Sequence, residues 1–258
     1  MRKRLSIILA VVGLMVLMTS SVVKAMGIGV GGTLGYVSMN MGDLKDWYAS
    51  KVTSFDDSGY TFTGRSFQSN ILYGVDGRFA FGENFMFRMG YSRLSGSQTI
   101  EITSPVSEKD GCQVSAHAIT GSLILAMPLD SFKVYGGGGL GYYLADCTIT
   151  DGFGTQQYIE KGSGSTIGFH GFVGTEIMMG KNFSISLEAL YRVAKLASIN
   201  CTESTQTGGF WEGPSTVRQP LRRHTNYPIV WPMDDTNYKD LELDFGGFNI
   251  LAALHIYF

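Results

Sequence analysis

An alternation of apolar and polar side chains with a period of two residues constrains this chain more than any other feature. It is clearest between residues 183 and 194, where one face carries Phe183, Ile185, Leu187, Ala189, Tyr191 and Val193. Successive side chains of a β-strand point to opposite faces, so the pattern predicts a strand with one apolar face. Similar segments lie at about 27–39, 71–81, 85–91, 113–127, 132–144, 167–179 and 243–258. Together these eight segments predict an all-β protein.

The connections between the segments alternate between short and long. Three-residue loops follow the second and sixth segments, at 82–84 and 180–182. A four-residue loop, 128–131, follows the fourth segment and would place Met127 opposite Phe132. Long loops are expected at about 40–70, 96–112, 147–164 and 198–242, and the first of them offers room for a short helix. An even number of strands, with short turns at one end and long loops at the other, is typical of outer-membrane barrels.

Composition favours a membrane barrel over a soluble one. Charged residues make up only 16% of the chain and aromatic residues 12%, and 34 residues are glycine. Soluble domains carry roughly 25% charged residues, whereas a barrel in lipid needs an apolar exterior. A soluble ligand-binding barrel would turn its apolar face inward, and periodicity alone does not separate the two. The net charge of −2 and the absence of a basic block make nucleic acid an unsuitable partner.

The first residues predict an export signal. Three basic residues, Arg2-Lys3-Arg4, precede an apolar run from Leu5 to about Met18, and Val23-Lys24-Ala25 follows. A basic start, an apolar centre and a small-x-small ending are the parts of a secretory signal peptide. The apolar run is shorter than the roughly 20 residues of a membrane-spanning helix. We therefore expect residues 1–25 to be cleaved, leaving 26–258 as the mature barrel.

The last segment carries the family resemblance. Alternate residues of this segment are apolar up to the final aromatic residue: Phe248, Ile250, Ala252, Leu254, Ile256 and Phe258. Such an ending resembles the terminal signal of bacterial outer-membrane barrels, and with eight strands the chain resembles the small OmpA- and OmpX-type barrels. The resemblance implies an eight-stranded antiparallel up-and-down transmembrane β-barrel in the cell outer membrane, surrounded by lipid and lipopolysaccharide. It further implies that the barrel-assembly machinery reads the last strand, and no periplasmic domain is expected.

Charged residues of both signs fall on the inward faces of the predicted strands. They are Asp76, Arg78, Arg88, Lys133, Glu176, Glu188 and Arg192. The turn at 82–84 places Arg78 opposite Arg88, and two facing arginines need a carboxylate nearby, for which Glu188 or Asp76 is suitable. An eight-stranded barrel has an interior that side chains can fill. We therefore expect a salt-bridged lumen, with a narrow pore for small solutes or ions as the alternative.

Two cysteines predict a disulfide. If Met127 faces Phe132, the same register places Cys112 opposite Cys147 at the outer end of the hairpin, with both side chains facing inward. An exported protein matures under oxidising conditions, which permit a disulfide. Cys201 would then remain unpaired. The alternative is that the spacing is coincidental and the thiols are free.

The remaining candidates concern surface contacts and catalysis. In the last long loop, aromatic and arginine side chains are suited to contact an extracellular protein or glycan: Phe210, Trp211, Arg222, Arg223 and Trp231. Ser115 and His117 face lipid near the outer rim, an arrangement that resembles lipid A-modifying hydrolases, although no orienting acid is evident beside them. The sequence contains no metal-ligand spacing, phosphate loop or cofactor motif. We expect a non-enzymatic surface protein without cofactors.

Overall fold

The structure is a computed structural model. It describes residues 27–57, 61–69, 71–82, 84–104, 108–129, 132–153, 156–180, 182–207, 213–215, 222–224 and 238–258. The signal peptide predicted at residues 1–25 lies outside these residues. Within the described part of the chain, every helix is too short or too polar to cross a membrane.

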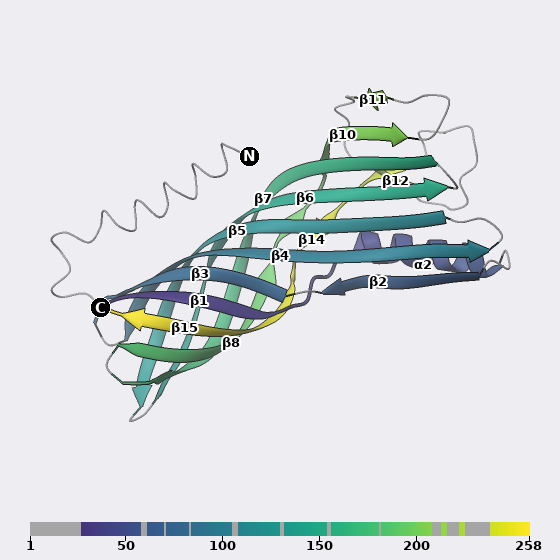
Figure 1. The fold of residues 1–258 in the computed structure, drawn as a ribbon. Coiled ribbons are helices and arrows are strands. Elements are labelled where there is room, and N and C mark those ends of the chain that lie inside the picture. The colour runs from purple at the N-terminus through teal and green to yellow at the C-terminus, as the bar shows by residue number, and fades with distance from the viewer. Residues whose placement is uncertain are drawn as a thin grey trace.

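Eight antiparallel strands close into a barrel (Figure 1). They are β1 (Gly27–Val37), β3 (Ile71–Ala80), β4 (Phe85–Ser104), β5 (Glu108–Leu129), β6 (Phe132–Phe153), β7 (Gln156–Met178), β8 (Phe183–Val193) and β15 (Gly247–Tyr257). Neighbours in sequence are neighbours in the sheet, and β15 pairs with both β8 and β1 to close the ring. The predicted up-and-down eight-stranded barrel is therefore confirmed.

The apolar faces of the strands form the outside of the barrel. Exposed side chains include Ile71, Tyr73, Val75, Leu123, Leu125, Met127, Ile167, Phe169, Val173, Ile177, Phe183, Ile185, Leu187, Tyr191 and Val193. The charged faces point into the lumen, where Asp76, Arg78, Glu176, Glu188 and Arg192 are buried. A barrel in lipid requires an apolar outside and a polar inside, whereas a soluble barrel would bury its apolar faces.

Short turns join the strands at one end, called here the short-turn end. Phe81 N donates to Phe85 O at 2.8 Å, and Met179 N donates to Phe183 O at 2.7 Å, as expected for the two three-residue loops. The turn between β5 and β6 is shorter than predicted, because Leu129 rather than Met127 pairs with Phe132. The predicted register of this hairpin is wrong by two residues. A two-residue shift preserves which side chains face outward, so the assignment of faces survives the error.

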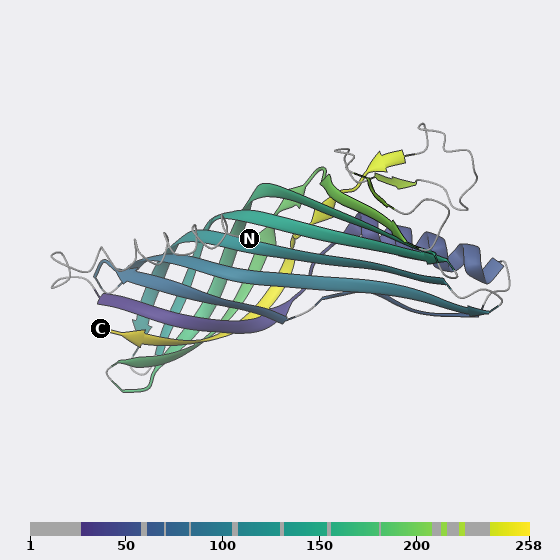
Figure 2. The ribbon, with the colours of Figure 1, turned by 45° about the horizontal axis from the view of Figure 1, so that its top comes forward.

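At the opposite end, called here the extended end, β4 to β7 continue beyond the barrel as an open sheet (Figures 1 and 2). Edge strands β2 (Thr61–Ser69), β10 (Asn200–Thr207) and β11 (Gly213–Ser215) widen this sheet, and α2 (Gly42–Asp57) contacts it at β2. Two small ladders pair β9 (Lys195–Leu196) with β14 (Leu243–Asp244), and β12 (Arg222–His224) with β13 (Tyr238–Asp240).

Much of what the sequence predicted as loop is therefore strand. The intervals 96–112 and 147–164 lie almost entirely within β4 to β7, and 40–70 contains α2 and β2. The fourth predicted loop, 198–242, contains β10 to β13. The apolar outer face that marks a strand in lipid is not required beyond the membrane, while the backbone ladder continues unchanged. The strand signal therefore weakens before the strands end.

Candidate functional site: the barrel lumen

An ion-pair network centred on Arg78 crosses the lumen. The Arg78 guanidinium lies 3.3 Å from Asp76 Oδ1 and 3.3 Å from Glu176 Oε1, and the side chain is 1% exposed. Glu176 also accepts hydrogen bonds from Ser184 Oγ and, at 2.6 Å, from Tyr257 Oη. One cation is thus shared between two carboxylates, and hydroxyl groups from neighbouring strands supply further hydrogen bonds. Pairing and hydrogen bonds of this kind let charges be buried, although Glu176 Oε2 has no hydrogen-bond partner among the described residues.

The second arginine of the lumen has its own carboxylate. Arg88 is the register partner of Arg78 and donates to both carboxylate oxygens of Glu188, at 2.7 and 3.3 Å. Its guanidinium also lies 4.1 Å from the centre of the Phe172 ring. Both carboxylates proposed from the sequence therefore lie beside the arginine pair, Asp76 at Arg78 and Glu188 at Arg88. Lys133 is nearer the short-turn end, with its amine 5.9 Å from the centre of the Tyr257 ring.

An apolar layer lies beside this network, with the Tyr135 and Phe172 rings against Arg78 and Arg88. It consists of Met86, Ile124, Ala126, Tyr135 and Phe172. These inward side chains are buried, and together with the ion pairs they fill the part of the lumen nearer the short-turn end, as expected for a barrel of this size.

A second apolar layer, called here the mouth plug, closes the extended end. Two chain segments just outside β1 and β15 contribute its inner residues, which are at most 2% exposed: Met39, Met41, Leu44, Leu241, Leu243 and Phe245. Backbone bonds join the segments, from Asn40 N to Gly246 O at 2.9 Å and from Met41 N to Asp244 O at 3.1 Å. The sequence interpretation missed this plug. Its signal was present, because Met39, Met41 and Leu241, Leu243, Phe245 continue the two-residue alternation.

Side-chain bonds also hold the plug in place. Asp43 Oδ2 accepts from Glu242 N at 3.1 Å, and Lys195 pairs with Glu242 at 2.8 Å. That contact raises the pKa of the Lys195 ammonium, since the adjacent carboxylate stabilises the charged form. Arg192 Nε donates to Phe245 O at 2.7 Å, which fastens the plug to the barrel wall.

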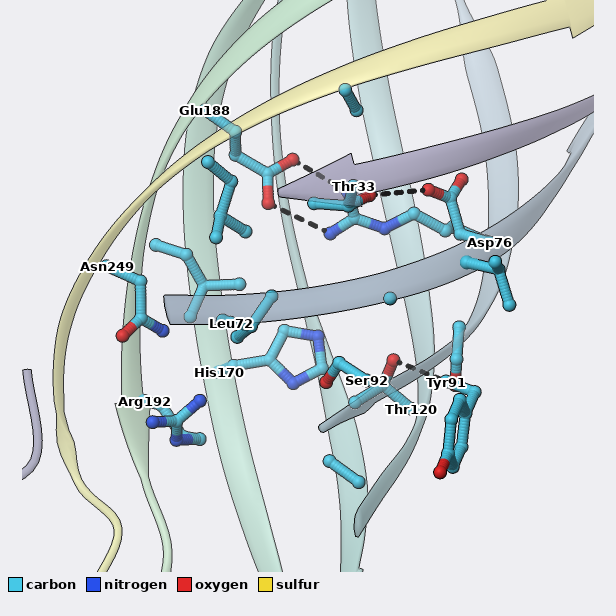
Figure 3. A pocket seen from close by; sticks show the side chains of 18 of the residues that line it. Thr33, Leu72, Asp76, Tyr91, Ser92, Thr120, His170, Glu188, Arg192 and Asn249 are labelled. Atoms are coloured by element: carbon cyan, nitrogen blue, oxygen red, sulfur yellow. Dashed lines mark hydrogen bonds and ion pairs between the residues drawn. The ribbon is translucent and has the colours of Figure 1, made fainter. Parts of the chain in front are cut away.

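Between the network and the plug lies a cavity of about 80 Å³ (Figure 3). Charged and polar side chains line it together with a few apolar ones: Asp76, Arg78, Arg88, His170, Ser186, Glu188, Arg192, Asn249, Leu72 and Tyr143. A space of this size holds a few ordered waters.

All three cysteines belong to the apolar cluster around the mouth plug. The Sγ atoms of Cys112 and Cys147 are 3.7 Å apart and both side chains are 1% exposed. In register, however, Cys112 pairs with Ile149, and Cys147 pairs with Val114. The two cysteines are therefore diagonal neighbours rather than directly opposite, and the predicted direct pairing is wrong for the same reason as the β5–β6 register. Burial raises the pKa of the Cys201 thiol.

The outward pair Ser115 and His117 lies at the rim of the barrel. His117 Nδ1 is 2.6 Å from Tyr91 Oη, and the two rings are stacked with centres 5.9 Å apart. Asp146 is the register partner of Ser115, so an acid that sequence reasoning missed lies beside this pair. Among the described residues, no group of three or more His, Cys, Asp or Glu side chains is arranged to hold a metal ion.

The surface candidates fall on the last loop. Arg222 and Arg223 belong to β12, while Phe210, Trp211 and Trp231 lie outside the described residues. Outward-facing apolar residues of β15, and Phe258 directly after it, are exposed: Phe248, Ile250, Ala252, Leu254, Ile256 and Phe258.

An antiparallel barrel with an apolar exterior and a charged interior defines an integral membrane protein of the β-barrel class. The chain belongs to the outer membrane protein beta-barrel domain family, whose model matches residues 7–210. The protein is accordingly an outer-membrane protein. No curated protein sequence matches it.

Several solved structures resemble this one at low sequence identity. The outer membrane protein OprG from Pseudomonas aeruginosa is 12% identical, with a TM-score of 0.47 over 91% of this chain and 96% of that one. Neisserial surface protein A is 10% identical, with a TM-score of 0.42 over 91% and 98%. Ail of Yersinia pestis, solved with the heparin analogue sucrose octasulfate, is 9% identical, with a TM-score of 0.37 over 90% and 97%.

Proposed function

We propose that this protein is a closed, non-enzymatic outer-membrane barrel that presents a folded surface to the outside of the cell. The mouth plug carries this proposal. Met39, Met41 and Phe245 are at most 1% exposed and lie across the end of the lumen, where a channel would need an opening. Because their backbone groups are hydrogen-bonded to the barrel and to each other, the plug belongs to the folded barrel rather than to a loose loop.

Closure does not depend on the plug alone. A solute entering from the short-turn end would meet both the apolar layer around Phe172 and the ion pairs of Arg78 and Arg88. Opening a path past the ion pairs would separate buried charges from their partners, which is costly in a low-dielectric interior. The barrel is therefore best suited to act as a scaffold.

The surface role rests on the extension of β4 to β7. These strands are 20–23 residues long, whereas a tilted strand needs only about 9–11 residues to cross the membrane. The excess forms a wide sheet bearing α2, and such ordered surface is suited to contact an extracellular protein or a glycan. Arg222 and Arg223, with Phe210, Trp211 and Trp231, are proposed contact residues.

Export and assembly complete the proposal. Residues 1–25 direct secretion and are removed, and the barrel-assembly machinery reads the outward residues of β15 that end at Phe258. In the finished barrel the exposed apolar band contacts lipid, and lipopolysaccharide surrounds the extended end.

Epitope insertion tests which end of the barrel faces outward. We expect a short tag inserted between Phe153 and Gln156, where β6 and β7 meet, to bind antibody on intact cells. A matched tag at Gly82, in the turn between β3 and β4, should bind only after permeabilisation, because short turns face the periplasm. Both sites are strand connections, which tolerate insertion. If intact cells bind antibody through the tag at Gly82 and not through the tag between Phe153 and Gln156, the proposed surface role is contradicted.

A further inference from the structure

We propose that Asn182 is a positioning residue that selects the register in which the last strand, β15, closes the barrel. Its side-chain amide donates to Tyr257 O at 2.7 Å, a contact called here the Asn182 clamp. The clamp lies at the short-turn end, where β15 runs between β8 and β1 (Figure 1) and Phe258 N donates to Ile28 O at 2.9 Å. This role concerns assembly of the barrel and is independent of any extracellular partner.

The clamp is a ladder step completed by a side chain. Asn182 occupies the register position that follows the pair of Phe183 with Ile256, directly opposite Tyr257. Its backbone carbonyl accepts from Tyr257 N at 2.7 Å, as in a regular antiparallel pair. The return bond to Tyr257 O comes from Asn182 Nδ2, where a regular pair would use the backbone N–H. The amide therefore extends the pairing of β8 with β15 by one position.

The same arrangement occurs a second time in the molecule. The loops 82–84 and 180–182 both begin with a glycine in the left-handed region, with φ of 88° at Gly82 and 89° at Gly180, and both end with asparagine. Asn84 O accepts from Ala126 N at 2.8 Å, and Asn84 Nδ2 donates to Ala126 O at 3.1 Å. Asn84 thus makes the same two bonds to β5 and provides a matched control.

Chain connectivity explains why only the clamp on β15 would select a register. A short connection fixes the register of a hairpin, as for β4 and β5, which residues 105–107 join. Residues 194–246 separate β15 from β8, and β1 and β15 are the first and last strands of the ring, so the register of β15 is not set by a turn. A slip of two residues would keep its apolar side chains outward. Contacts particular to one alignment must therefore exclude the slip: the β9–β14 ladder at the extended end and the Asn182 clamp at the short-turn end.

The native alignment also completes the ion-pair network of the lumen. Tyr257 Oη donates to Glu176 Oε1 at 2.6 Å and accepts from Arg78 Nη1 at 3.3 Å. A slip of two residues moves a strand by roughly 7 Å, which would withdraw the Tyr257 hydroxyl from both partners. The Asn182 clamp therefore links closure of the ring to completion of the Arg78 network.

Disulfide trapping measures the register of β15. In the native register Ile185 of β8 lies opposite Leu254 of β15, and both side chains are exposed on the outside. Ile185→Cys with Leu254→Cys traps this alignment, whereas Ile185→Cys with Ala252→Cys or with Ile256→Cys traps a slip of two residues in either direction. Each refolded variant is oxidised in detergent micelles, and mass spectrometry of the linked peptides separates these bonds from those of the native cysteines.

With Asn182 in place, we expect the native crosslink to dominate. Asn182→Ala should raise the ratio of slipped to native crosslinks about fivefold, because a hydrogen bond made in only one alignment is lost. Asn182→Asp keeps the size of the side chain and removes its donor, so it should give a similar rise. Asn84→Ala removes the same bond from β5 and should leave the ratio unchanged. Heat-dependent gel mobility verifies that each variant is folded.

Two results would overturn the proposal. An unchanged ratio in both Asn182 variants would mean that other contacts, such as the β9–β14 ladder, set the register. An equal rise in Asn84→Ala would mean that the ratio reports a general loosening of the short-turn end. A rise confined to the Asn182 variants supports the clamp, since a merely stabilising contact would not change which residues of β8 and β15 face each other.

Discussion

Arg78→Leu is expected to reduce the free energy of unfolding of the barrel by about 3–5 kcal/mol, because it leaves two buried carboxylates without their cation. Arg78 Nε and Nη1 each lie 3.3 Å from a carboxylate, those of Asp76 and Glu176, and both acids are at most 8% exposed. Leucine retains part of the apolar stem and removes the charge, the donors and the volume of the guanidinium. Urea unfolding of the protein in lipid vesicles, followed by gel mobility and fluorescence, measures the difference.

Two further variants separate the loss of charge pairing from other effects. Lys161→Gln breaks the exposed pair with Glu203, whose side chains are 48% and 53% exposed, and should change stability by less than about 0.5 kcal/mol. Adding Asp76→Asn and Glu176→Gln to Arg78→Leu should recover much of the loss, since removing both signs avoids an unpaired charge. If Arg78→Leu costs less than about 1 kcal/mol, the network does not hold the lumen closed.

The second large effect is expected at Cys112 and Cys147. Their Sγ atoms are 3.7 Å apart in the apolar cluster around the mouth plug, and a periplasmic disulfide oxidant would accept the two electrons released when the bond forms. We predict that Cys112→Ser lowers the free energy of unfolding of the oxidised protein by about 2–4 kcal/mol. Cys201→Ser, which leaves the pair intact, is the matched control.

Thiol labelling of the denatured protein decides whether the disulfide forms. A maleimide reagent should modify one cysteine, Cys201, in protein taken directly from outer membranes, and all three after reduction. The Cys201→Ser variant should then show no labelling before reduction. Three reactive thiols in unreduced wild-type protein would contradict the disulfide.

The barrel itself could be predicted because its governing signal is local. In lipid, every second residue of a strand must be apolar, so segments such as 183–193 show both their conformation and their outward face in the sequence. The same parity placed Arg78, Arg88 and Glu188 inside. The register error between β5 and β6 did not change the assignment of faces, because a shift of two residues leaves the faces unchanged.

The extended end could not be predicted in the same way, because the contacts that form it join residues far apart in sequence. Beyond the membrane neither face of β4 to β7 must be apolar, so the apolar pattern stops before the strands do. The sequence therefore predicted loops where the strands continue. The mouth plug combines Met39 and Met41 with Leu243 and Phe245, about 200 residues apart in sequence, and only the closure of β15 on β1 brings them together. These contacts can be predicted only once the closure of the barrel is known.

Solute and ion flux through liposomes that contain the refolded protein tests the closed lumen most directly. Refolding is verified by heat-dependent gel mobility, empty liposomes give the background, and liposomes with a general porin show that the assay detects a pore. We expect neither small sugars nor monovalent ions to cross faster than background, because the mouth plug and the ion pairs of Arg78 and Arg88 block the lumen. Flux above background from folded protein would contradict closure and identify a small-solute channel.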